Sequence, residues 1–383
     1  MNDFVEKEKI SYLKRLTDDA ILSYIEREQS QEIIYYGLFL LKNPALKISE
    51  LERLTSVELK VKLLNSIKKY DYIIRGIEGL YKTSDCSKIR EGLLPSELTF
   101  GIEIEAKGEK NQIFIDNFNY EKWKIVEENT VNKGVEFVSP IMHYTREDLS
   151  NISRVCTFMD ANDFFVNQSC GGHIHMGFEY LKKVNEFLNL LFLYNYFEKE
   201  LYLISNNEKF MCRDAAKRYA NSFKHIFDTM EIFVKNSKKL DFDAIKRFIE
   251  IDSRILNYKD FGLNIYNIIN RLNNTIEFRV PNGTLEYDDW HKNIILYGSI
   301  MKYAKKISSS KDSQSNFYDF ISDNRTPDIR INNFMNMLFE DEDLKNIYYS
   351  RYNAHLEDPM VKKLEIKEFN FNKYRTLRTL AEK

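Results

Sequence analysis

The sequence predicts an α+β protein in which a curved, largely antiparallel sheet is flanked by helices and preceded by an N-terminal helical module. Segments with alternating apolar and polar residues lie between helical segments of unequal length, without the regular strand–helix repeat of a parallel sheet. Gly (13) and Pro (6) are scarce among the 383 residues, which favours long elements and substantial helix content.

The composition is that of a globular protein without a strong charge bias. Hydrophobic residues make up 43% and charged residues 30% of the chain, and the formal net charge is −2. This balance argues against binding to nucleic acid or to a membrane surface. No apolar run has the length of a membrane span, the N-terminus is too charged for a signal peptide, and the four cysteines show no C-x-x-C spacing. We therefore expect a cytoplasmic protein.

Three regions are expected along the chain. Residues 1–95 carry apolar residues at helical spacing, and their pattern ends near Gly92 and Pro95. Residues 96–310 contain the strands, and residues 311–383 form a C-terminal helical extension. The N-terminal helices, which include a stretch at 48–72, either bind a protein partner or substrate, or pack as an extension of the main domain.

Alternation and helical spacing predict the elements within residues 96–310. Thr145 and Asp148 resemble a capping box at the start of a helix that runs through Met159. The expected strands are 98–106, 122–127, 135–139, 173–177 and 275–280, and the further expected helices are 184–205 and 285–307.

The first strand, LTFGIEIEA (98–106), has two different faces. Phe100, Ile102 and Ile104 form an apolar face, whereas Glu103 and Glu105 point the other way, about 6.5–7 Å apart. Carboxylates this close repel one another unless a cation lies near them, and Mg²⁺ and Mn²⁺ prefer such oxygen ligands. A solvated edge strand with two surface glutamates is the alternative.

Three later segments repeat this arrangement. GVEFVSP (134–140) presents Glu136, CGGHIHMG (170–177) presents His173 and His175, and TIEFRVPNGT (275–284) presents Glu277 and Arg279, while 122–127 offers only Glu127. If the apolar faces meet one core, these polar residues line one concave surface. Carboxylates and histidine there suit Mg²⁺ or Mn²⁺, and an arginine suits a phosphoryl group. The chain has no P-loop and no G-x-S-x-G motif, and the ligands are too oxygen-rich for structural zinc.

Four segments of the chain resemble, in this order, the motifs of the putative amidoligase family: FGIEIE, KGVEFVSP, CGGHIHMG and TIEFRVPNGT. That family belongs to the glutamine synthetase and γ-glutamylcysteine ligase superfamily of carboxylate–amine ligases. The resemblance covers about residues 97–305 and implies a glutamine synthetase-like catalytic domain at 96–310, whose concave sheet face binds ATP and two or three Mg²⁺ or Mn²⁺ ions. It implies metal ligands at Glu103, Glu105, Glu136, His173 and Glu277.

The resemblance also implies roles in catalysis and nucleotide binding. His175 would contact an ATP phosphate and Arg279 would lie near the transferred phosphate, so that Arg279, Glu277 and His175 carry the reaction. Asn264, in GLNI (262–265), is expected to contact nucleotide or substrate. The sequence departs from the family pattern at two places where substrate contacts are expected. The family usually carries Asp and Ser where this chain has EENTV (127–131), and an Arg-Tyr pair where it has Asn257 and Tyr258.

The expected function is an ATP-dependent ligase that joins a small-molecule or peptide carboxylate to an amine through an acyl phosphate. A kinase of guanidino or carboxyl groups and a nucleotide-binding scaffold without activity are the alternatives. A loop within 206–220 is expected to exclude water from the intermediate. Its Arg213, Lys217 and Arg218 either bind a carboxylate or form a charged helix surface.

Overall fold

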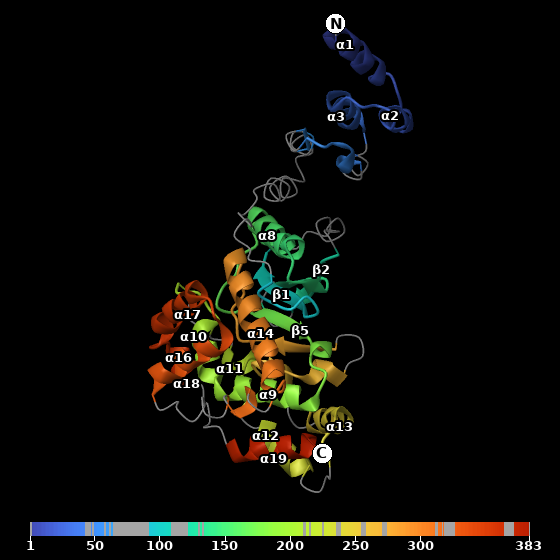
Figure 1. Ribbon diagram of the computed structural model, residues 1–383. Coiled ribbons are helices and arrows are strands. Elements are labelled where there is room, and N and C mark those ends of the chain that lie inside the picture. The colour runs from blue at the N-terminus through green and yellow to red at the C-terminus, as the bar shows by residue number, and fades with distance from the viewer. Residues whose placement is uncertain are drawn as a thin grey trace. The chain divides into compact units, whose positions relative to one another are not determined.

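The computed structural model forms two compact units, residues 1–86 with 150–165 and residues 87–149 with 166–383 (Figure 1). It describes residues 2–42, 47, 50–56, 59–60, 63, 92–108, 122–128, 131, 134–209, 212–213, 216–223, 226–234, 239–253, 258–269, 274–310, 313–315, 317, 326–363 and 371–382. Most of the expected helical stretch 48–72, and Asn257, lie outside the described residues.

The described part of the N-terminal segment is mainly helical, as its apolar spacing predicts. It contains α1 (Asn2–Leu13), α2 (Asp18–Ile25), α3 (Gln31–Leu40) and the short 3₁₀ helix η1 (Leu51–Arg53). Leu13, Ile21, Ile33 and Leu38 are buried in a common core. The Ser30 hydroxyl accepts a hydrogen bond from the Ile33 amide and so caps α3, as a serine before a helix is expected to do.

Strands from distant parts of the chain form one antiparallel sheet. Within the described residues they are β1 (Thr99–Lys107), β2 (Lys124–Glu128), β3 (Gly134–Val138), β4 (Met142–His143), β5 (Gly172–Gly177), β6 (Leu263–Asn264) and β7 (Thr275–Phe278). Their order is β2-β3-β1-β5-β7-β6, with β4 pairing beside β1. The five strands predicted from alternation are confirmed within two residues at each end. β4 and β6 have two residues each, too few to show a period.

Helices make up most of the remaining described chain, so the predicted α+β class is confirmed. They are α8 (Arg146–Ala161), α9 (Val184–Tyr196), α10 (Glu198–Ile204), α11 (Ala216–Tyr219), α12 (Ile226–Val234), α13 (Phe242–Asp252), α14 (Tyr287–Ile307), α16 (Pro327–Leu338), α17 (Glu342–His355), α18 (Pro359–Lys363) and α19 (Phe371–Ala381). Short 3₁₀ helices occur at η4 (Phe178–Tyr180), η5 (Tyr258–Asp260) and η6 (Tyr266–Ile269). The single helix expected at 184–205 is divided at Phe197, where the Tyr196 carbonyl accepts a hydrogen bond from Arg330.

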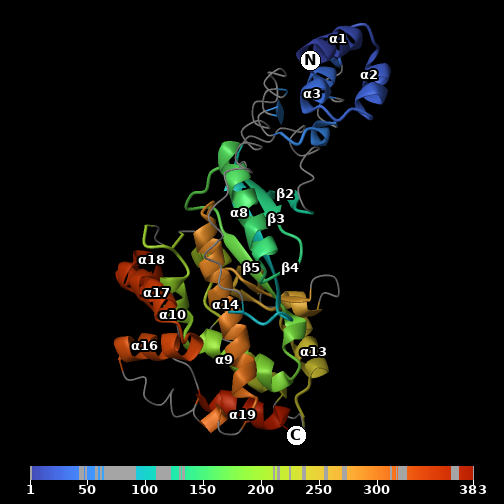
Figure 2. The same ribbon diagram turned by 45° about the horizontal axis from the view of Figure 1, so that its top comes forward.

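The helices α9 and α14 cover the apolar face of the sheet. Figure 2 shows α14 alongside β5, and the two elements are in contact. The Phe278 ring of β7 stacks on Tyr297 of α14 with 4.2 Å between ring centroids, and it also contacts Tyr194 of α9. Successive side chains of a strand point to opposite faces of the sheet. Because the apolar side chains lie on the face covered by α9 and α14, the polar side chains of each strand lie on the opposite face.

None of the described helices is both long enough and apolar enough to cross a lipid bilayer.

One substitution tests the core directly. Ile174 of β5 is fully buried, so Ile174→Val should lower the free energy of unfolding by about 1 kcal/mol through the loss of one methylene and the small cavity left behind. Ile141, 81% exposed, is the control, and Ile141→Val should change stability by less than about 0.5 kcal/mol. Equal effects in denaturant titrations would contradict the burial assigned to Ile174.

Candidate active site

The register of the strands brings the predicted residues together on one face. The directly opposed pairs are Glu103 and His173, Glu105 and Glu136, His175 and Glu277, and Asn264 and Glu277. Opposed side chains on one face of an antiparallel pair have Cβ atoms about 4.5–5.5 Å apart. Residues separated by up to 174 positions in the chain (Glu103 to Glu277) therefore meet in a single cluster.

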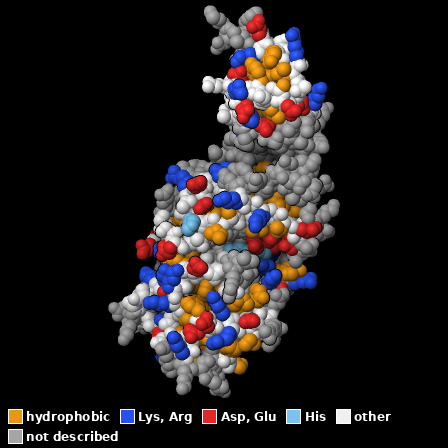
Figure 3. Space-filling model, turned by 90° about the vertical axis from the view of Figure 1, so that its right-hand side faces the viewer, with side chains coloured by type: hydrophobic (Ala, Val, Ile, Leu, Met, Phe, Trp, Pro, Cys, Tyr) orange, Lys and Arg blue, Asp and Glu red, His pale blue; other side chains and the backbone are white. Residues whose placement is uncertain are grey.

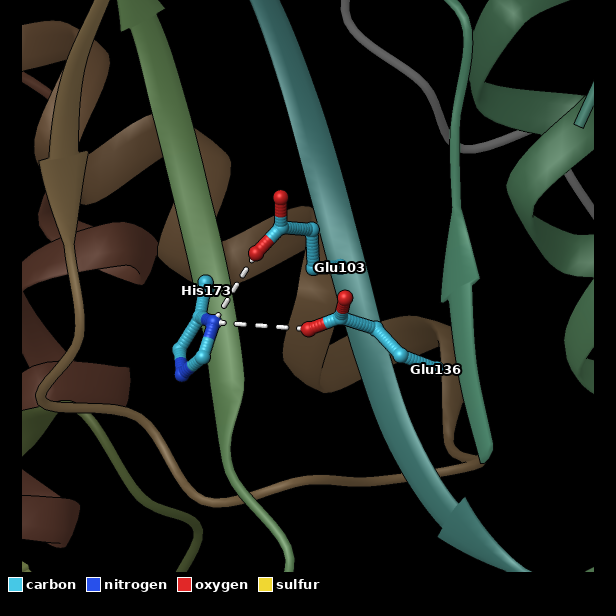
Figure 4. Close-up of side chains that lie close together, drawn as sticks. All are labelled: Glu103, Glu136 and His173. Carbon is cyan, nitrogen blue, oxygen red and sulfur yellow. Dashed lines mark hydrogen bonds and ion pairs between the residues drawn. The ribbon is translucent and has the colours of Figure 1, made fainter. Parts of the chain in front are cut away.

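His173 lies at the centre of this cluster. Its Nδ1 atom is 3.0 Å from a Glu103 oxygen, 3.5 Å from Glu277 and 3.9 Å from Glu136, and its Nε2 atom is 3.3 Å from Glu105. Figure 4 shows Glu103 and Glu136 pointing toward the imidazole ring. His173 is 2% exposed. One buried imidazole thus has a carboxylate oxygen from four different glutamates within 4 Å.

His175 extends the cluster toward β7. Its Nε2 atom is 3.1 Å from the second Glu103 oxygen, and its Nδ1 atom is 3.1 Å from the Thr275 hydroxyl. Burial disfavours the charged forms of Glu103 and His175, but the attraction between their opposite charges outweighs this effect. The pKa of Glu103 therefore lies well below its usual range because of His175 and His173, and the pKa of His175 is raised by Glu103 and Glu277.

Glu277 is held in place by donors on either side. Its Oε2 atom accepts hydrogen bonds from the side-chain amides of Asn264, at 2.7 Å, and Asn267, at 3.3 Å. Its Oε1 atom accepts one from Arg279, whose Nε atom also donates to the Tyr219 carbonyl at 3.2 Å. Burial would raise the pKa of Glu277, but Arg279 and His175 reverse the effect and lower it. Glu277 is therefore a carboxylate with a fixed orientation.

The structure gives Asn264 partners within the protein. It is 1% exposed, its amide donates to Glu277, and its oxygen accepts the Tyr266 amide hydrogen at 2.9 Å. Both ends of the side chain are thus used to orient Glu277 and the following turn.

A second group of carboxylates lies at the other end of the face. Oxygens of Glu105, Glu128 and Glu136 lie within 4.8 Å of one another. Burial, together with the charges of Glu103, Glu105 and further glutamates, raises the pKa of Glu136 to about 9. Glu136 therefore holds a proton near neutral pH unless a cation takes its place.

These residues fit divalent metal ions. Three overlapping sets have ligand atoms within 4.8 Å of one another: Glu103, Glu136 and His173; Glu103, His175 and Glu277; and Glu105, Glu128 and Glu136. On the face shown in Figure 3, red Asp and Glu side chains gather beside pale-blue His near the middle of the larger unit. Oxygen-rich sets with at most one imidazole favour Mg²⁺ or Mn²⁺, and crowded carboxylates are stable only when a cation or a proton offsets their charge.

Glu128 is absent from the site residues predicted from the sequence, where the segment 122–127 offers only the neighbouring Glu127. Glu127 pairs with Val135 and is exposed, whereas Glu128 shares the face of Glu136. The signal was present in the sequence, because buried Trp123 and half-buried Ile125 have the same phase as Glu127 and so assign Glu128 to the polar face.

This difference gives a matched test of metal binding. Glu128→Gln should weaken Mn²⁺ binding by roughly tenfold or more, because affinity depends on the number of charged ligands. Glu127→Gln removes the same charge one residue away, on the opposite face, and should leave the affinity unchanged. Mn²⁺ titrations followed by electron paramagnetic resonance measure both. Equal affinities for the two variants would remove Glu128 from the site.

The cationic residues expected to bind a carboxylate lie in different environments. Arg213 is 1% exposed and lies beside Glu105, so it belongs to the site face. Arg218 is exposed, with its guanidinium over the Tyr219 ring, as on an ordinary helix surface. The Lys217 side chain, residues 210–211 and 214–215 of the expected water-excluding loop, and residues 129–130 of EENTV lie outside the described residues.

Comparison with known proteins identifies the family of the chain. No curated protein matches the sequence. The family described as putative amidoligase enzyme matches residues 110–301, half of the chain, which includes β2 to β7 and most of α14. Glu103 and Glu105 lie on β1, just before the matched range. The chain belongs to the putative amidoligase family.

Proposed function

We propose that the protein is an ATP-dependent carboxylate–amine ligase that activates a small-molecule or peptide acid as an acyl phosphate. Membership of the amidoligase family supports the formation of an amide bond. The observation that carries the proposal is the convergence of five carboxylates, two imidazoles and Arg279 on one face of the sheet. The proposal includes a glutamine synthetase-like use of this face, with ATP and Mg²⁺ or Mn²⁺ bound there.

Charge balance supports the metal ions. The carboxylates of Glu103, Glu105, Glu128 and Glu277 face the guanidinium groups of Arg213 and Arg279 and the imidazole of His175, and Glu136 adds a fifth carboxylate when it loses its proton. The excess negative charge would repel the phosphates of a nucleotide. These carboxylates would hold Mg²⁺, which would supply positive charge for the nucleotide and for the charge that develops during phosphoryl transfer.

The protein residues would act mainly by position and charge. Glu277, fixed by Asn264 and Asn267, holds Arg279 at the edge of the cluster. The planar guanidinium of Arg279 would bind oxygens of the transferred phosphoryl group. His175, whose raised pKa favours its charged form, would add a second donor to phosphate.

The chemistry follows from the poor reactivity of carboxylates toward amines. An oxygen of the substrate carboxylate attacks the γ-phosphorus, the bond to the β-phosphate oxygen breaks, and ADP leaves. The amine then attacks the acyl carbon, the bond to the phosphoryl oxygen breaks, and inorganic phosphate and a proton leave. Neither step requires a nucleophile from the protein.

Hydroxylamine trapping tests this proposal. With ATP, Mg²⁺, a panel of amino acids and peptides, and hydroxylamine in place of the amine, we expect a hydroxamate together with ADP and phosphate. A phosphorylated product without hydroxamate would identify a kinase, and AMP with pyrophosphate would identify adenylation. Nucleotide binding without turnover in any mixture would identify a scaffold. Each of these outcomes contradicts the proposal.

A further inference from the structure

Arg213 occupies a gap that a glycine leaves on the site face. Gly171 lies just before β5, two residues from His173, so it shares the polar face. A Cβ atom built on Gly171 would lie 1.6 Å from Nη1 of Arg213. The guanidinium therefore fills the position where a side chain at residue 171 would stand. A segment between α10 and α11 thus contributes a cation to a face built by strands.

The contacts of Arg213 place it among the residues of the candidate site. Its Nη1 atom is 3.8 Å from a Glu105 oxygen, and its Nη2 atom donates a hydrogen bond of 3.0 Å to the Arg279 carbonyl. The same Glu105 oxygen accepts the Gly171 amide hydrogen at 2.5 Å. The guanidinium therefore lies between a proposed metal ligand and the backbone of the proposed phosphate-binding arginine.

Part of the hydrogen-bonding capacity of this guanidinium has no partner among the described residues. A guanidinium carries five N–H donors, and the Nε atom of Arg213 has no partner among the described residues although the residue is 1% exposed. Burying a charged donor without an acceptor is costly, and the usual remedy is an anion. Glu105 at 3.8 Å is too far for a hydrogen bond and does not supply one.

The backbone of Arg213 is fixed from two sides. Its amide donates to the Asn282 side chain at 2.9 Å, just beyond the TIEFRVP segment. The preceding Cys212 amide donates to Asp358 at 2.7 Å, from the turn between α17 and α18. Asp358 is 2% exposed. Arg213 is thus held in place by neighbours that do not use its guanidinium, which is the arrangement of a binding group prepared for a ligand.

We propose that Arg213 binds an oxyanion of the reaction beside Glu105. This inference rests on the proposed ligase function. The shared chemistry is a planar or tetrahedral group with two or more oxygens, supplied by the carboxylate of the acid substrate or by the transferred phosphoryl group. The forked donors of arginine match either group.

Anion-dependent thermal unfolding tests this assignment. Sodium acetate and inorganic phosphate are titrated separately into the full-length protein with saturating Mg²⁺, against sodium chloride at equal ionic strength. A ligand that binds the folded state raises the unfolding temperature according to its concentration and Kd. Mg²⁺ binding is measured independently by calorimetry. The variants are Arg213→Met, Arg213→Lys and Gly171→Ala, with exposed Arg218→Met as the control.

We expect Arg213→Met to raise the Kd of at least one anion tenfold or more while Mg²⁺ affinity stays within about threefold. Arg213→Lys should lie between this variant and the wild type, and Arg218→Met should match the wild type. The anion that is affected identifies the source, acetate for the acid substrate and phosphate for the phosphoryl group. Gly171→Ala displaces the guanidinium without removing a charge, so it should reproduce Arg213→Met, and it decides the question if Arg213→Met does not fold.

Three results would overturn the assignment. They are wild-type anion affinity in Arg213→Met, no anion response in the wild type, and loss of Mg²⁺ binding together with anion binding, which would make Arg213 a support for Glu105. A wild-type protein that binds no Mg²⁺ would instead contradict the proposed function. The same titrations in EDTA would then decide on Arg213 alone, since an anion response that depends on Arg213 supports the assignment and its absence overturns it.

Discussion

Glu277→Gln should lower the rate of ATP cleavage by at least about 100-fold, because it removes a buried charge that both fixes Arg279 and faces the proposed metal site. Glutamine keeps the shape and can still accept from Asn264 and Asn267, so the fold should persist. Since the lost interaction stabilises the transition state, kcat should fall rather than KM alone rise.

Arg279→Lys should also lower the rate of ATP cleavage. Lysine keeps the charge but lacks the planar fork with which Arg279 contacts Glu277 and the Tyr219 carbonyl at the same time. Single-turnover measurements of ADP release quantify both variants, with Glu127→Gln as the control on the opposite face of β2. Wild-type rates in Glu277→Gln would exclude this part of the cluster from catalysis.

The stability of the metal-free protein should fall as the pH rises, because Glu136 carries a raised pKa. The unfolded chain ionises this group near pH 4.5, whereas the folded protein holds the proton until about pH 9. Between these values the folded state binds more protons, so the free energy of unfolding falls by up to about 1.4 kcal/mol per pH unit. The raised pKa of His175 acts in the same direction above pH 6.5.

Denaturant titrations in EDTA at pH 6, 7 and 8 measure this slope. Glu136→Gln should flatten it, since glutamine cannot ionise. Mg²⁺ should restore stability more at pH 8 than at pH 6, because displacing the Glu136 proton costs less free energy at the higher pH. A slope that is unchanged in Glu136→Gln, or an Mg²⁺ effect independent of pH, would show that Glu136 does not hold the proton that the cation displaces.

Strand periodicity is sufficient to predict most of the candidate site. Once Ile102 and Ile104 are assigned to the core, Glu103 and Glu105 must share the other face. The same step assigns His173 and His175 of β5. What periodicity cannot supply is the register between strands, which depends on tertiary packing. The pairing of Glu103 with His173, and of Glu105 with Glu136, is therefore information from the structure.

The remaining site residues depend on segments without a usable period. Asn267 lies on a short 3₁₀ helix and reaches Glu277 only because η6 follows β6 closely. Arg213 precedes a helix of four residues, and nothing in its sequence neighbourhood distinguishes it from the exposed Arg218. Its burial follows from Gly171, more than 40 residues away, which leaves room for the guanidinium.

Anomalous scattering from crystals grown with Mn²⁺ and a non-hydrolysable ATP analogue tests the central claim most directly. We expect Mn²⁺ bound by oxygens of Glu105, Glu128 and Glu136. A second ion should lie among Glu103, Glu277 and His173, whose Nδ1 atom is 3.0 Å and 3.5 Å from the two carboxylates, with ligand distances of about 2.1 Å at both ions. The phosphates of the analogue should lie between the ions and Arg279. Saturating Mn²⁺ that leaves these carboxylates without an anomalous peak, or a nucleotide bound elsewhere, would contradict the account.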